Sequence, residues 1–209
     1  DHTSFKKYIR VISSDKDIYW YTTVILNRLM FCYFVQKKGF LDMNTNYLQD
    51  KLKWVKEQQG ENKFFGTFYK GFLVALFHEG LNRPTHETAE FLSIYGRIPY
   101  LNGGMFEEHQ LERENNGIDI DDIAFENLFN FFDKWNWHLD TRLTASGKDI
   151  NPDVLGYIFE QYINDRAQMG AYYTKEDITE YIGRNTIVPY LMDATRKHDE
   201  KPFKPNGEV

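Results

Sequence analysis

The sequence is poor in cysteine. Cys32 is the single cysteine among 209 residues, so a disulfide within the chain is excluded. Cys32 lies in an apolar run, which predicts a buried free thiol rather than a nucleophile. Because a chain without disulfides suits a reducing compartment, we expect a cytoplasmic protein.

An excess of positive charge is also missing. The 25 Lys and Arg residues are outnumbered by 31 Asp and Glu residues, which gives a formal net charge of −6. A domain that grips duplex DNA unaided usually has a basic excess, because neutralising phosphates supplies much of the affinity. The local run of Lys51, Lys53 and Lys56 is interpreted as the solvated face of a helix. The composition therefore argues against independent DNA binding.

The chain lacks an uninterrupted hydrophobic run of membrane-spanning length. The best candidate is residues 18–35, but Asn27 and Arg28 stand in its middle, and a charge there is costly in lipid. We therefore expect a buried helix and no membrane association. The polar start, Asp1-His2-Thr3-Ser4, does not resemble a signal peptide. Because no initiator Met is present, we expect an excerpt of a longer protein.

Aromatic residues, in contrast, are abundant. Phe, Trp and Tyr make up 17% of the chain, which predicts wide side chains that interlock between helices. A helix is predicted over residues 15–38, with Ser13 or Ser14 as its N-cap and Gly39 at its left-handed end. Apolar residues at helical spacing predict two more helices, over residues 46–59 and 63–78.

The second half of the chain is less regular. Glycine and proline punctuate residues 84–117, which predicts an irregular connection with defined turns. A helix over residues 120–135, capped near Asp119, and a short extended segment over 135–139 are expected to follow. Asn151 and Pro152 suit the start of another helix. The last helix is predicted to open at Thr174 and to run at least to Arg184, with a kink or restart at Pro189.

These patterns predict an all-α or mainly α fold. We expect an irregular multi-helix bundle with a long Gly/Pro-containing connection and at most a short β element. The predicted organisation is an N-terminal lead-in (1–14), a helical domain (15–150), helices that lead towards a further domain (151–195) and a polar tail (196–209).

Catalytic signatures are mostly missing. No Cys/His cluster has zinc-ligand spacing, and no Gly-x-Ser-x-Gly, Walker-type or Gly-x-Gly-x-x-Gly loop occurs. The six histidines are scattered along the sequence and are interpreted as structural or solvated. Asp119, Asp121 and Asp122 are interpreted as a helix start, where anions favour the dipole, rather than as a metal site. We therefore assign no metal ligands and no catalytic residues.

Residues 97–106 form the first distinctive segment. Asn102, Gly103 and Gly104 permit left-handed backbone angles, and apolar residues flank them. One interpretation is a tight turn that Tyr100, Leu101 and Phe106 pin into the core. The other is a surface of backbone amides that binds a phosphate, which would make the turn a weak nucleic-acid contact.

Residues 170–177 form the second distinctive segment of the sequence. Thr174 and Asp177 match a variant of the capping box, and Gly170 and Ala171 leave the backbone open to close approach. The adjacent rings of Tyr172 and Tyr173 either pack beside the helix cap or offer faces to a small molecule, whose carboxylate the helix N-terminus would attract.

Four segments in this order resemble the helical region that precedes the catalytic core of adenine-N6 DNA methyltransferases. The similarity is to fused type IIG restriction-modification enzymes and to methylases of BREX-like phage defence, and it covers roughly residues 18–191. The segments are Arg28-Leu29-Met30-Phe31 with Lys38-Gly39-Phe40-Leu41, Ile98 to Phe106, Leu155-Gly156-Tyr157-Ile158-Phe159-Glu160, and Gly170-Ala171-Tyr172-Tyr173-Thr174.

The resemblance implies a cofactor, S-adenosylmethionine. Residues 170–174 match motif X of that family, which lines the methionine end of the cofactor pocket, although Lys175 stands where the family has Pro. The glycine loop and the Asn/Asp-Pro-Pro-aromatic motif, which holds the flipped adenine, are missing. We therefore expect a fragment that is inactive alone and binds the cofactor too weakly to detect. Its expected partners are a methyltransferase core after it, DNA through the whole enzyme, and, as one option, a nuclease before it.

A second hypothesis comes from a different class of protein. A free-standing helical interaction module would explain the acidic charge and the missing catalytic residues equally well. A nuclease domain is disfavoured, because no Pro-Asp followed by Asp/Glu-x-Lys lies on an alternating strand. The sequence downstream in the encoding gene discriminates between the first two.

Overall fold

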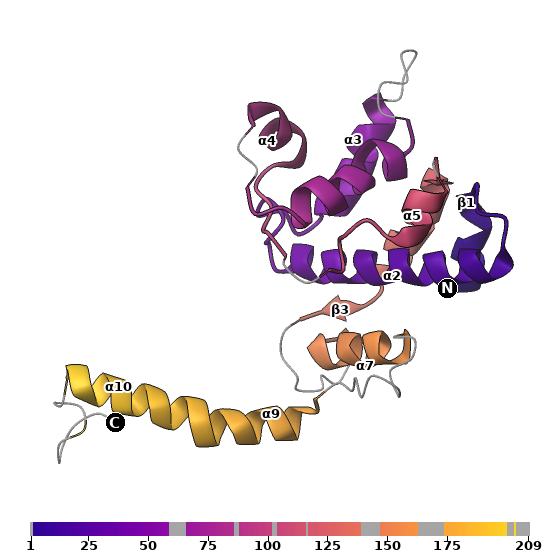
Figure 1. Ribbon diagram of the computed structural model, residues 1–209. Coiled ribbons are helices and arrows are strands. Elements are labelled where there is room, and N and C mark those ends of the chain that lie inside the picture. Colours follow the sequence, from indigo (N-terminus) through magenta and orange to yellow (C-terminus); the bar gives the residue numbers. More distant parts are fainter. Residues whose placement is uncertain are drawn as a thin grey trace. The chain divides into compact units, whose positions relative to one another are not determined.

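The computed structural model describes residues 2–58, 66–85, 88–101, 104–115, 117–138, 147–162, 174–199 and 203. The chain forms two compact units, Asp1–Leu155 and Gly156–Val209, which are described separately. Helices dominate the described part of each (Figure 1), so the predicted mainly α class is confirmed. The functional division predicted at residue 151 stays a prediction.

The first unit begins with short elements and a long helix. In chain order its elements are α1 (His2–Phe5), the 3-10 turn η1 (Lys6–Tyr8), β1 (Ile9–Arg10), α2 (Asp15–Lys37), α3 (Tyr47–Gln58), the π turns η2 (Tyr69–Leu73) and η3 (Leu76–Leu81), α4 (Ala89–Tyr95), α5 (Gln110–Glu114), β2 (Asp119–Ile120), α6 (Asp122–Phe132), β3 (Asn136–Trp137) and β4 (Asp149–Ile150). Helix α7 (Pro152–Tyr162) crosses into the second unit, which also holds α9 (Glu176–Ile182), the π turn η4 (Gly183–Ile187) and α10 (Val188–His198).

Helix α2 follows the sequence prediction closely. The Ser14 hydroxyl accepts a hydrogen bond from the backbone N–H of Asp17, and Gly39 follows the helix with φ +74°. A left-handed residue at this place ends a helix most cheaply when it is glycine. Arg28 is 2% exposed, so the apolar run is a buried helix, as predicted.

The core of the first unit is built from aromatic rings of several helices. Phe68 stacks on Phe72 at 5.4 Å and meets Phe125 edge-on at 5.3 Å, while Phe72 stacks on Tyr95 at 5.0 Å. Ring pairs at these distances stabilise a core beyond their buried area. Cys32 is fully buried in this unit, as predicted for a structural thiol.

The predicted helix over 63–78 differs in form from the observed one. Its described part starts at Phe68, contains two π turns and continues to Leu81. A π turn bonds each N–H to the carbonyl five residues earlier and so inserts one residue into the helix. Gly80 lies in the second π turn, where a Cβ would stand 2.5 Å from Cδ1 of Ile98. The glycine lets the segment after α4 pack directly on the helix.

The connection over 84–117 is more regular than predicted. It contains α4, where the Thr88 hydroxyl accepts from the N–H of Phe91, and α5, where His109 is the N-cap. Both helices are too short to show a sustained apolar period. Their capping residues therefore gave the only local signal for them.

The helix predicted over 120–135 starts two residues later. Asp119 and Ile120 belong to β2, whose register with β1 pairs Ile9 with Ile120, and the N-cap of α6 is Asp121. The prediction missed the strand because its partner lies more than 100 residues away in the sequence. The aspartates that looked like one helix start therefore divide between a strand and a helix.

Two further sequence predictions are confirmed. The extended segment near 135–139 contains β3, which pairs in parallel with β4. The Oδ1 atom of Asn151 accepts a hydrogen bond from the N–H of Val154 at 3.1 Å and so caps α7. Asn is among the best N-cap residues, and a Pro directly after it loses no hydrogen bond.

In the second unit, α9, η4 and α10 follow one another without a break. Ile182 and Ile187, at the two junctions, keep helical backbone angles. Pro189 lies in the first turn of α10, directly after the π turn, so the predicted disturbance takes the form of a wide turn. The predicted cap is wrong by one residue, because the N-cap is Lys175 and no side chain caps the helix.

Among the described helices, none is both long enough and apolar enough to span a membrane.

Candidate functional site

The buried side chain of Arg28 makes three hydrogen bonds inside the first unit. Its Nη1 donates to Glu112 at 2.8 Å, its Nε donates to the carbonyl of Met105 at 2.8 Å, and its Nη2 donates to the carbonyl of Glu107. Arg28 lies on α2, and the three acceptors lie on α5 and on the segment before it. One guanidinium therefore fixes the path of residues 105–112.

Glu112 collects the other polar side chains of this cluster. Tyr21 donates to its Oε1 at 2.8 Å, the backbone N–H of His109 donates to Oε2 at 2.6 Å, and Nε2 of His78 lies 3.6 Å from Oε2. Burial alone would raise the pKa of Glu112, but His78, Arg28 and the His109 N–H hold that pKa well below its usual range. The carboxylate is therefore charged at neutral pH.

Two tyrosines and a backbone carbonyl complete the cluster. The hydroxyls of Tyr21 and Tyr69 contact each other, and burial raises the pKa of both. His78 Nδ1 lies 2.9 Å from the carbonyl oxygen of Phe106, which can only accept, so the imidazole donates there. We name this set the Glu112 cluster: Tyr21, Arg28, Tyr69, His78, His109 and Glu112.

The Glu112 cluster suits positioning better than chemistry. The carboxylate and guanidinium already have several partners each, and their side chains are only 8% and 2% exposed. A small cavity of about 220 Å³ lies beside it and is lined in part by Tyr69, His78 and Glu112. Such a saturated network rigidifies the parts of the chain that it joins.

The cluster also joins two segments that the sequence singled out. Arg28 belongs to the first and Met105 to the second, and the rings of Phe31 and Phe106 meet edge-on at 6.1 Å. Phe106 is buried as predicted, whereas Tyr100 is 43% exposed, so the prediction that Tyr100 is pinned in the core is wrong. These contacts support the structural interpretation of residues 97–106.

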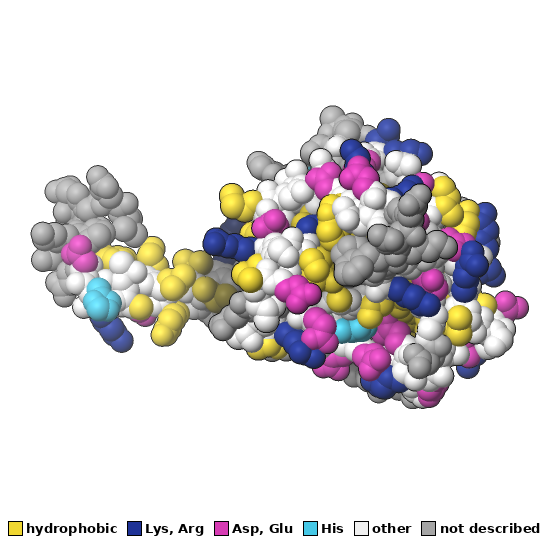
Figure 2. Space-filling model, turned by 90° about the horizontal axis from the view of Figure 1, so that it is seen from above, with side chains coloured by type: hydrophobic (Ala, Val, Ile, Leu, Met, Phe, Trp, Pro, Cys, Tyr) yellow, Lys and Arg dark blue, Asp and Glu magenta, His cyan; other side chains and the backbone are white. Residues whose placement is uncertain are grey.

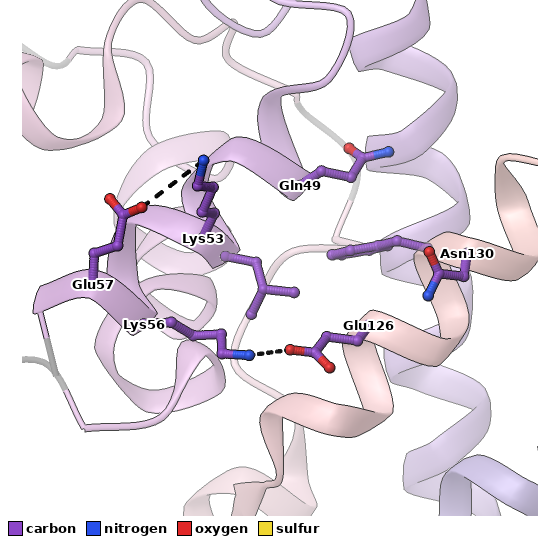
Figure 3. A pocket seen from close by; sticks show the side chains of 8 residues that line it. Gln49, Lys53, Lys56, Glu57, Glu126 and Asn130 are labelled. Carbon is purple, nitrogen blue, oxygen red and sulfur yellow. Dashed lines mark hydrogen bonds and ion pairs between the residues drawn. The ribbon is translucent and has the colours of Figure 1, made fainter.

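A second hollow lies between α3 and α6. Its volume is about 480 Å³, and its rim carries the ion pairs Lys53–Glu57, at 3.9 Å, and Lys56–Glu126 (Figure 3). Both lysines lie on a solvated face, as predicted. Lys51 does not: its ammonium donates to the carbonyl of Ile94, and burial lowers its pKa. Of the three lysines in the basic run, only Lys51 is therefore withdrawn from the solvated face.

The predicted site residues are placed only in part. Gly170, Ala171, Tyr172, Tyr173, Asn102 and Gly103 lie outside the described residues. Thr174 is exposed just before α9, and Gly104 is exposed in a turn with φ +72°. The proposed cofactor and phosphate contacts therefore stay predictions.

The histidines are less scattered in space than in sequence. His78 and His109 both contact Glu112, although 31 positions separate them along the chain. The capping-box spacing from His109 to Glu112 was a usable signal, since a carboxylate three residues after an N-cap bonds back to its N–H. Within the part of the chain that the structure describes, no group of three His, Cys, Asp or Glu side chains could hold a metal ion.

The helix formed by α9, η4 and α10 presents a row of apolar side chains to solvent. Figure 2 shows hydrophobic side chains along this helix, at the left of the view. The exposed fractions run from 42% to 73%. The residues are Ile178, Tyr181, Ile182, Ile187, Val188, Tyr190, Leu191 and Met192.

Comparison with known proteins relates the chain to restriction-modification proteins. It is 32% identical, over 193 residues, to the "Putative type II restriction enzyme and methyltransferase RM.MjaORFECS2P" of Methanocaldococcus jannaschii. The alignment covers 88% of this chain but only 16% of that protein. No family model and no solved structure matches the chain. The chain is therefore similar to one part of a much longer protein that is named for both restriction and methylation.

Proposed function

We propose that this chain is a helical region of an S-adenosylmethionine-dependent, adenine-N6-specific DNA methyltransferase of a restriction-modification or phage-defence system. The observation that carries the proposal is the 32% identity to the restriction enzyme and methyltransferase, which extends over nearly the whole chain. In the whole enzyme, this region would position the part that precedes it, support the methyltransferase core, and supply one wall of the cofactor site. The chain would be inactive alone, and the type IIG arrangement with a fused nuclease is part of the proposal.

The contacts of Arg28 support the bracing role. They tie the first resemblance segment to the second inside one core, so those segments have a structural reason to occur together. The segment at 170–174 lies in the other unit. In our proposal it provides Tyr172, Tyr173 and Thr174 to the cofactor pocket.

The apolar row on α9, η4 and α10 supports a further folded neighbour. Large exposed apolar patches usually mark surfaces that another protein part covers. In our proposal that part is the methyltransferase core, which would contain the glycine loop and the adenine pocket.

The test uses the full-length protein from the encoding gene. Methyl transfer from labelled S-adenosylmethionine to duplex DNA is measured, and the modified base is identified. We expect N6-methyladenine, and we expect Tyr173→Ala to raise the KM for the cofactor about tenfold or more, the equivalent of about 1.4 kcal/mol. Tyr19→Ala, at an exposed tyrosine of α2, is the matched control and should leave the KM unchanged.

Three results would contradict the proposal. Methylation of cytosine would refute the adenine specificity. A gene without a downstream glycine loop and Asn/Asp-Pro-Pro-aromatic motif would favour the interaction module. Micromolar binding of S-adenosylmethionine by the isolated chain in calorimetry would mean that the pocket is more complete than we propose.

A further inference from the structure

Both ring nitrogens of His109 face hydrogen-bond donors. The backbone N–H of Leu111 points at Nδ1 at 3.2 Å, and the indole N–H of Trp20 points at Nε2 at 3.2 Å. A neutral imidazole has one bare nitrogen and can accept one of these bonds, whereas an imidazolium has none and can accept neither. The surroundings of His109 therefore favour the neutral ring over the imidazolium.

The charges around the ring act in both directions. Arg28 on α2 and Arg113 on α5 disfavour a proton on His109, while Glu112 and Glu114 favour one. Burial has the largest effect, and the pKa of His109 is lowered from its ordinary value. The polar and charged groups around the His109 ring are Trp20 and Arg28 from α2 and Glu112, Arg113 and Glu114 from α5. Glu112 is in turn contacted by Tyr21 and Arg28 from α2, Tyr69 from η2 and His78 from η3.

His109 is also the N-cap of the short helix α5. Helix α5 has five residues, and a helix this short is not stable without capping and packing. In its capping box the His109 side chain accepts from the helix, and Glu112 accepts from the N–H of His109. Glu112 is at the same time the carboxylate partner of buried Arg28.

We propose that the protonation state of His109 controls whether the Glu112 cluster holds α5 against α2. When the ring is neutral, it caps α5 and keeps Glu112 in place against Arg28. When the ring is protonated, the cap is lost, α5 frays, and residues 105–115 loosen from α2. This inference does not depend on the proposed methyltransferase function.

The experiment follows His109 and α5 in the whole chain by NMR and amide hydrogen exchange. The ring nitrogens of His109 are titrated, and protection factors for residues 110–115 are compared at pH 7.5 and pH 5.5 after correction for intrinsic exchange. The key variant is His109→Asn, because Asn caps helices well and does not titrate. The matched control is His198→Asn at the exposed end of α10.

We expect His109 to titrate below about 6.5, the ordinary value for histidine. Between pH 6.5 and the lower pKa of the ring in the folded state, protection of residues 110–115 should fall by up to about tenfold per pH unit in the unaltered chain and in His198→Asn, but not in His109→Asn. A His109 that titrates above 6.5 overturns the proposal without any variant. An equal loss of protection in His109→Asn also overturns it, because another group would then be responsible.

Discussion

The two units of the chain differ in what their helices pack against. In Asp1–Leu155 the aromatic side chains interlock and even a guanidinium is buried with its partners. In Gly156–Val209 the apolar residues of α9 and α10 lie exposed. An amphipathic helix gains most of its stability from packing its apolar face. The first unit thus has the internal contacts of a folded domain, whereas α9 and α10 of the second unit leave apolar side chains exposed.

A buried ion pair of the first unit should contribute far more to stability than an exposed pair of the second. Arg28→Met should cost about 3–5 kcal/mol of unfolding free energy, because it leaves Glu112 buried without its main cation. Arg184→Met breaks an exposed i, i+4 pair with Glu180 and should cost at most about 0.5 kcal/mol. Denaturant unfolding of both variants measures the difference. Equal costs would mean that the two units do not differ as described.

Gly96 and Gly104 both have a positive φ but differ in how closely other residues pack against them. Gly96 has φ +69° and ψ −159°, a region essentially reserved for glycine, and a Cβ there would stand 2.3 Å from the carboxylate of Asp42. Gly96→Ala should cost about 3 kcal/mol. Gly104→Ala has a similar φ but open space around it and should cost about 1 kcal/mol. Thermal unfolding checks both, and a cost for Gly104→Ala that matches Gly96→Ala would remove the packing argument.

Acid should act on the first unit through Glu112. Its pKa is depressed in the folded state, so its stabilising contribution is present above the unfolded value of about 4.3 and is lost as the pH falls below it. The slope should reach at most about 1.4 kcal/mol per pH unit. Glu112→Gln should be less stable at pH 7 and should lack this slope between pH 5 and pH 3. An unchanged slope in urea titrations of Glu112→Gln would assign the acid sensitivity elsewhere.

Two threonines that precede helices should each make only a small contribution to stability. Thr88 caps α4 through its hydroxyl, so Thr88→Ala should cost about 1 kcal/mol. Thr174→Ala should cost less than about 0.5 kcal/mol, because the N-cap of α9 is Lys175 and the structure gives it no side-chain cap. Exchange of the amides of Phe91 and Ile178 provides the local measurement. A large loss of protection at Ile178 in Thr174→Ala would restore the cap predicted from the sequence.

Local signals in the sequence predicted the helices well where they were long. Ser14, Gly39 and Asn151 each act within a few residues of their own position, so their roles could be inferred without the fold. The pairing of β1 with β2 could not, because it joins Ile9 to Ile120. Short helices such as α4 and α5 escaped because five to seven residues hold too little of a period.

The same limit applies to the candidate site. Residues 28 and 105–106 were singled out by resemblance, yet nothing in the sequence showed that the Arg28 guanidinium bonds the Met105 carbonyl. His78 and His109 were interpreted as isolated because their meeting point, Glu112, depends on how α2, η3 and α5 pack. Tertiary packing, not residue type, created the cluster.

The wide turn between Gly183 and Ile187 has a geometric consequence for whatever covers the last helix. One inserted residue rotates everything after it by about 100° relative to an uninterrupted α-helix. This rotation moves Ile187 and Leu191 towards the helix face that carries Ile178 and Ile182. In an uninterrupted α-helix the two pairs would lie on nearly opposite faces. Deletion of a single residue in that turn would leave the chain helical but split its apolar surface into two halves that face different directions.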